Sequence, residues 1–167
     1  TNLGYIVPSI AATGSEAIEY IKTKKINLVL MDIVLQGEMD PIETAKEIIS
    51  GFDIPVIYLT AYIDETMLKQ AKKSGAYGYL VKPFKDREMQ ATIELALYRH
   101  EMEKKLKASE DQLYTTLISI NDAVISTDNT GLIIFMNPLA ESLTGWKVKN
   151  ARKKSLEDIF NIRLDEK

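Results

Sequence analysis

The chain has 167 residues, of which 46% are hydrophobic and 27% are charged, a composition typical of a folded globular protein. It contains no cysteine, which excludes disulfides and thiolate sites, and one histidine, which excludes most zinc sites and argues against a Ser-His-Asp triad. The net charge of -3 gives no electrostatic basis for nucleic-acid binding. From the sequence we expect neither a membrane-spanning helix nor a secretory signal.

The first half of the chain alternates short β-type runs with helical runs, which predicts βαβ units and a parallel sheet. The predicted strands are Tyr5 to Ile10, Leu28 to Met31, Val56 to Leu59 and Tyr77 to Val81. The predicted helices are Gly14 to Lys24, Pro41 to Ile49 and Asp64 to Ser74. We interpret Asp40 as the N-cap of the second helix, because Pro41 suits the first helical position.

From Asp86 to about Ile120 no glycine or proline occurs, which predicts one unusually long helix. Small or apolar residues recur in steps of three and four at Met102, Leu106, Ser109, Leu113, Thr116 and Ile120. This spacing is typical of the seam of a parallel coiled coil. The alternative is one face of a single amphipathic helix that packs on its own domain.

After Ile120 the β-type pattern returns. The predicted order is strand, turn, strand and helix, over residues 123–127, 128–131, 132–136 and 137–143, with Gly145 ending the helix. About 45 residues follow Ile120, so we expect this second unit to be too short to close a core alone.

Three polar residues directly follow three of the predicted strands: Asp32, Thr60 and Lys82. Ligands bind at the carboxyl ends of the strands in an open α/β sheet, so we expect these residues to form an anion site. The Asp32 carboxylate can act as a nucleophile and form an acyl phosphate, while the hydroxyl and the ammonium bind phosphoryl oxygens. Attack of one anion on another requires a divalent cation.

Three segments make residues 1–100 resemble the receiver domain of two-component response regulators: LVLMDIVLQGEMDPIETA, VIYLTAY and GAYGYLVKPF. The resemblance implies that Asp32 accepts a phosphoryl group from a histidine kinase or a phosphotransfer protein, and that Thr60 and Lys82 bind that group. It also implies Mg²⁺ ligation by Asp32 and the backbone carbonyl of Val34, a switch formed by Thr60 and Tyr79, and a cis peptide bond before Pro83.

The family begins with a strand that ends in two Mg²⁺-binding acidic residues, and neither the strand nor the acidic pair is found in this sequence. In the family's strand order, 2-1-3-4-5, that strand is central. Its loss would leave buried backbone groups of two neighbouring strands unpaired, at about 1–3 kcal/mol for each group. We therefore expect neither a normal receiver sheet nor normal Mg²⁺ binding, and interpret the chain as a truncated receiver.

The segment NDAVISTDNTGLIIFMNPLAESLTGW, followed less closely by SLEDIF, resembles the start of a PAS sensory domain. The resemblance covers roughly residues 112–160, about half of such a domain, and implies no particular ligand.

We therefore predict a flavodoxin-like α/β receiver without its first strand (1–100), a linker or coiled-coil helix (101–120) and the beginning of an α+β PAS-like domain (121–167). The predicted function is that of a phosphoacceptor in a His-Asp phosphorelay, which passes a phosphorylation-dependent change through the helix to the PAS module. Its own catalysis would at most be self-phosphorylation and autodephosphorylation, within a larger protein such as a hybrid histidine kinase.

We expect a cytoplasmic homodimer, joined through the linker helix, that contacts a histidine kinase or phosphotransfer protein and neither nucleic acid nor membrane. The alternative is a vestigial receiver that is not phosphorylated and acts as a protein–protein interaction or dimerisation module. A flavodoxin-like enzyme or nucleotide binder is disfavoured, because the sequence has no Gly-rich phosphate loop.

Overall fold

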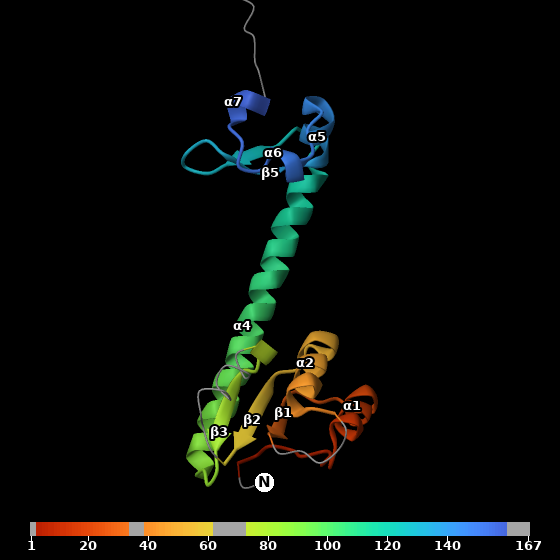
Figure 1. Ribbon diagram of the computed structural model, residues 1–167, viewed down its shortest axis with the longest axis vertical. Helices are drawn as coiled ribbons and strands as arrows, with labels where there is room; N and C mark the ends of the chain where they lie inside the picture. The colour runs from red at the N-terminus through yellow and green to blue at the C-terminus, as the bar shows by residue number, and fades with distance from the viewer. Residues whose placement is uncertain (1–2, 34–38, 62–72, 160–167) are drawn as a thin grey trace, which may run out of the picture. The chain divides into compact units, whose positions relative to one another are not determined.

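A computed structural model describes residues 3–33, 39–61 and 73–159 of the chain (Figure 1). The chain divides into two compact units, Thr1–Lys104 and Lys105–Lys167. One long helix, α4 (Asp86–Ser119), contributes residues to both units and agrees closely with the helix predicted from the composition.

The first unit contains a parallel sheet of three strands, β1 (Val29–Asp32), β2 (Val56–Thr60) and β3 (Gly78–Val81), in the order β1-β2-β3. The register pairs Asp32 with Leu59, and Thr60 with Val81, so the three strands end at the same edge. The predicted α/β class, with a parallel sheet, is confirmed.

Helices cover both faces of this sheet because side chains along each strand alternate between the two faces. Val56 and Tyr58 of β2 pack with α1 (Gly14–Thr23) and α2 (Pro41–Phe52), whereas Ile57 packs with α4. The first core consists of Ile18, Ile21, Met31, Ala45, Ile48, Val56 and Tyr58, and the second of Ile57, Leu80, Ile93 and Ala96.

Local chemistry fixes where α2 begins and ends. The side chain of Asp40 accepts a hydrogen bond from the Ile42 N–H at 3.3 Å, so the predicted N-cap is confirmed. Asp53 ends the helix in the left-handed conformation, with φ 55° and ψ 43°. The helix predicted over residues 64–74 lies mainly outside the described residues.

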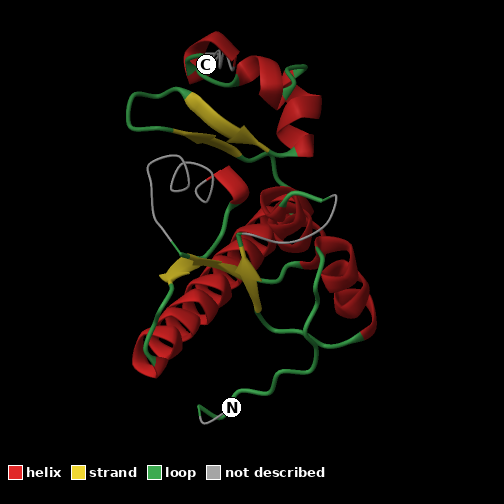
Figure 2. Ribbon diagram, turned by 60° about the horizontal axis from the view of Figure 1, so that its bottom comes forward, coloured by secondary structure: helices red, strands yellow, loops and turns green. Residues whose placement is uncertain are grey.

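The strand predicted from Tyr5 to Ile10 is wrong. This segment is a loop before α1 in Figure 2, and Ile6 and Ile10 are 89% and 84% exposed. β1 is an edge strand of the three-stranded sheet, and a groove of about 920 Å³ lies between it and the segment. Without a paired neighbour, an apolar β-type sequence gains no ladder hydrogen bonds and does not form a strand.

The second unit combines the end of α4 with an antiparallel hairpin and three short helices. The hairpin consists of β4 (Ile125–Thr127) and β5 (Ile133–Met136), and the helices are α5 (Pro138–Thr144), α6 (Val148–Ala151) and α7 (Leu156–Ile159). Its core consists of Ile133, Met136, Ala140, Ala151 and Ile159. Gly145 is the left-handed C-cap of α5, where the sequence predicts the helix to end.

Candidate functional site

Three predicted site residues lie at the carboxyl edge of the parallel sheet. Asp32 is the last residue of β1, Thr60 is the last residue of β2, and Lys82 directly follows β3. The ladder continues at this edge, because the N–H of Lys82 donates to the Thr60 carbonyl at 2.7 Å and that of Ile33 donates to the Leu59 carbonyl at 3.0 Å. The backbone therefore holds all three residues in register.

The side chains of Asp32 and Lys82 meet directly. The Lys82 ammonium donates a hydrogen bond to Oδ2 of Asp32 and forms an ion pair with it. The two side chains are 43% exposed for Lys82 and 36% for Asp32, so the carboxylate is accessible to a reactant from solvent. Thr60 is buried on the strand between them. This edge thus presents an accessible nucleophile beside a cation.

Of the remaining predicted site residues, Pro83 and Tyr79 are described by the structure and Val34 is not. The Lys82–Pro83 peptide bond is cis. Tyr79 lies in β3, opposite Tyr58 of β2, and is 43% exposed. Val34, the predicted carbonyl ligand, lies outside the described residues.

Mg²⁺ binds oxygen ligands in near-octahedral geometry, and Asp32 supplies one such carboxylate at this edge. Within the described ranges, no group of three or more His, Cys, Asp or Glu residues could hold a metal ion. Asp32 is thus the one predicted Mg²⁺ ligand that the structure describes.

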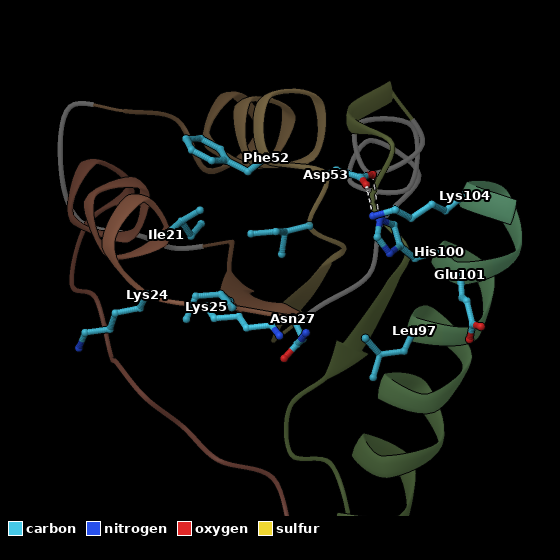
Figure 3. Close-up of a pocket in the computed structure, with 12 residues that line it drawn as sticks. Ile21, Lys24, Lys25, Asn27, Phe52, Asp53, Leu97, His100, Glu101 and Lys104 are labelled. Carbon is cyan, nitrogen blue, oxygen red and sulfur yellow. Dashed lines mark hydrogen bonds and ion pairs between the residues drawn. The ribbon is translucent and has the colours of Figure 1, made fainter. Parts of the chain in front are cut away.

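A second polar cluster, which the sequence analysis did not predict, lies at the amino-terminal side of the sheet (Figure 3). Oδ1 of Asp53 lies 3.0 Å from Nε2 of His100, and Oδ2 lies 3.0 Å from the Lys104 ammonium. The hydrogen bonds from these two side chains hold the pKa of Asp53 below its ordinary value. Asp53 is at the end of α2 and the other two residues are in α4, so the cluster ties α2 to α4.

Tyr77 extends this cluster. Its ring contacts the His100 ring edge-on at 5.5 Å between centroids, and its hydroxyl donates to Glu103 Oε2 at 2.8 Å. Burial, followed by the hydrogen bond to Glu103, raises the pKa of Tyr77 to about 12. The only sequence signal for this cluster is the four-residue spacing of His100 and Lys104, which places them on one helix face.

In a comparison with known proteins, each of the two units matches the model of a protein family. The model of the response regulator receiver domain matches residues 1–94, and that of the PAS fold matches residues 111–165. The transcriptional regulatory protein PdtaR of Mycobacterium tuberculosis is 35% identical over 112 residues, or 67% of this chain and 53% of PdtaR. The chain therefore spans about half the length of that relative.

Two solved structures resemble the first unit. The signal receiver domain of a modulated diguanylate cyclase from Desulfovibrio desulfuricans G20 has a TM-score of 0.57 and 31% identity, covering 61% of this chain and 81% of that one. The N-terminal domain of a response regulator/sensory box/GGDEF 3-domain protein from Carboxydothermus hydrogenoformans has a TM-score of 0.54 and 33% identity, covering 61% and 82%. In the described part of the chain, no helix has the length and apolar character needed to cross a bilayer.

Proposed function

The chain belongs to the response regulator receiver family, with a PAS fold after the receiver, and on that premise we propose that Asp32 is the phosphoacceptor of a His-Asp phosphorelay. The observation that carries the proposal is the contact between the Asp32 carboxylate and the Lys82 ammonium at the carboxyl edge of the sheet. An oxygen of Asp32 attacks the phosphorus of a donor phosphohistidine, and an acyl phosphate forms. The P–N bond breaks, and its electron pair stays on the histidine nitrogen.

The neighbouring side chains bind the transferred group. Lys82 already lies beside the carboxylate, so its ammonium pairs with a phosphoryl oxygen after only a small movement. Thr60 donates its hydroxyl to another oxygen, and Tyr79 turns inward as that hydroxyl moves. Receiver domains generally bind Mg²⁺, and Asp32 with the carbonyl of Val34 would be its ligands here.

The change at Asp32 reaches the PAS module through α4. In this proposal the receiver comprises residues 1–100, the linker 101–120 and the PAS-like domain the rest, in a cytoplasmic protein. Leu106 and Leu113 belong to the coiled-coil stripe and are more than 60% exposed, which supports a homodimer through the linker. The partners at the site are a histidine kinase or a phosphotransfer protein.

The test is phosphorylation of the purified chain. Incubation with Mg²⁺ and acetyl phosphate should increase the intact mass of the wild type by one phosphoryl group and leave that of Asp32→Ala unchanged. Asp111→Ala, at an exposed position of α4, is the matched control and should be phosphorylated like the wild type. A wild type that takes up no phosphoryl group, or an Asp32→Ala variant that still does, contradicts the proposal.

A second candidate is the vestigial receiver that acts as an interaction module. It is favoured because the described residues contain no cluster of three or more His, Cys, Asp or Glu residues that could hold a metal ion. If it is correct, no phosphorylation occurs, and association through the stripe persists. Sedimentation then shows a dimer for the wild type and for Lys107→Asp, next to the stripe, but a monomer for Leu106→Asp.

A further inference from the structure

Asn137 is the most fully hydrogen-bonded side chain of the second unit's described residues. It is completely buried, follows β5 directly and caps α5. Its Oδ1 accepts from the Ala140 N–H at 2.9 Å and from the Val124 N–H at 3.0 Å. Its amide nitrogen donates to the Asp122 carbonyl at 2.9 Å and to the Leu117 carbonyl at 3.2 Å.

These partners settle the orientation of the side-chain amide. Two backbone N–H groups face one end, which must therefore be the oxygen, and two carbonyls face the other end, which must be the nitrogen. A flipped amide would oppose like groups at all four contacts. Each hydrogen-bonding position of the side chain is thus matched to its partner.

Capping of α5 does not explain this choice of residue. An N-cap needs one acceptor oxygen, and Ser, Thr or Asp supplies it about as well as Asn. Asn differs in carrying two donors as well. Here both donors serve the chain before the hairpin, at the end of α4 and in the connection to β4.

The hydrogen bond from Asn137 to the Leu117 carbonyl lies at the C-terminal end of α4. Leu117 lies in the last turn of α4, where carbonyls have no partner within the helix. Every residue from 103 to 116 is exposed, and Leu117 is the first partly buried position after this stretch. The contact with Asn137 therefore lies where α4 first becomes partly buried after its long exposed stretch.

We propose that Asn137 is a positioning residue that couples the last turn of α4 to the β4–β5 hairpin and to the start of α5. A displacement of that turn moves the Leu117 carbonyl, and the buried amide must follow or lose its bonds. Because the same side chain caps α5 and holds the Val124 N–H, the displacement reaches both elements. The regulatory use of this coupling rests on the proposed function, in which α4 carries the signal.

The substitution Asn137→Asp separates the capping of α5 from the hydrogen bonds donated to the Leu117 and Asp122 carbonyls. The carboxylate has nearly the same shape and keeps the acceptor for α5, but it loses both donors and turns an oxygen toward two carbonyls. In hydrogen exchange of the full chain, protection of the Ile118 and Ser119 amides should fall roughly tenfold or more, while Ala140 stays protected. Asn150→Asp makes the same chemical change at an exposed position of α6 and should alter neither region.

Unchanged protection of Ile118 and Ser119 in Asn137→Asp overturns the proposal. If this variant unfolds the second unit, the test is made on the wild type instead, by NMR measurement of how fast the side-chain NH₂ groups of its asparagines exchange. The Asn137 amide should exchange far more slowly than that of Asn150, and equal rates contradict the coupling.

Phosphorylation tests the regulatory part. After acetyl phosphate treatment, the Asn137 side-chain NH₂ resonance should shift together with the hairpin amides in the wild type. Hairpin amides that shift while the Asn137 resonance stays in place overturn the proposal. If Asp32 is not phosphorylated at all, the proposed function fails, whereas the exchange results still decide the coupling.

Discussion

A close approach between α1 and α2 makes Gly14 sensitive to a single added methyl group. A Cβ at Gly14 would lie 3.0 Å from Cγ2 of Thr44, 3.2 Å from its Cβ and nearer still to its Oγ1. Thr44 cannot easily move away, because it is fully buried and its hydroxyl donates to the Asp40 carbonyl at 3.0 Å. The substitution Gly14→Ala therefore forces the two helices apart or strains Thr44.

The expected magnitude follows from two opposing effects. Overpacking costs about 1–3 kcal/mol, whereas replacing glycine with alanine in a helix gains at most about 1 kcal/mol. The first effect is larger, so Gly14→Ala should lower the free energy of unfolding by about 1–2 kcal/mol. Gly51→Ala in α2 is the matched control, because no atom lies within 4 Å of the added Cβ, and it should be neutral or stabilising.

A double-mutant cycle tests the mechanism, with urea unfolding of the full chain followed by circular dichroism. Thr44→Ala removes Oγ1 and Cγ2 and should by itself cost about 1 kcal/mol for the lost hydrogen bond. It also opens the space that the Gly14→Ala methyl group needs, so the double variant should be more stable than the sum of the two changes predicts. Additivity within about 0.5 kcal/mol, or a Gly14→Ala protein as stable as Gly51→Ala, would refute the reasoning.

Three further predictions concern the charged and phenolic groups. Lys82→Met should change the free energy of unfolding by less than about 1 kcal/mol, because the ion pair between Lys82 and Asp32 is partly exposed. The same substitution should weaken the structural response of the protein to phosphorylation of Asp32. A larger loss of stability in denaturant melts would indicate a mainly structural lysine. Because the pKa of Asp53 is lower in the folded state, its hydrogen bonds with His100 and Lys104 stabilise the protein above about pH 4, its ordinary pKa range, and this contribution is lost as the pH falls further. The stability difference between the wild type and Asp53→Asn should therefore be present at pH 7 and shrink toward pH 2, and a difference that grows in acid would contradict the assignment. Tyr77→Phe should remove one phenol that titrates at about pH 12 in an ultraviolet titration, and a spectrum unchanged at that pH would count against the buried hydroxyl.

Local sequence patterns predicted those helices and strands whose own residues indicate their type. Asp32, Thr60 and Lys82 follow short apolar runs that become β1, β2 and β3, and the composition after Asp86 produces α4. The Tyr5 to Ile10 segment shows the limit, because its β-type sequence cannot reveal whether a strand lies beside it. The contact between Asp53 and His100 joins residues 47 positions apart, and no local pattern encodes such a pair.

From the sequence, Asn137 is recognisable only as part of a helix start. Its acceptor role follows from its place before Pro138, since N-caps are recognisable from neighbouring residues. Its donor role depends on where the Leu117 and Asp122 carbonyls lie in space, which no spacing in the sequence specifies.

Among the described residues no strand pairs with the outer side of β1, and we expect this edge to matter in concentrated solution. The N–H groups of Val29 and Ile33 point toward β2, so that of Leu30 between them points outward, and the Leu30 side chain is 38% exposed. Val-Leu-Met along this edge has none of the lysines or prolines that keep such edges from pairing with other molecules. The isolated chain should therefore be prone to β-type aggregation that begins at this edge, and Leu30→Lys should act as a gatekeeper that keeps it in solution.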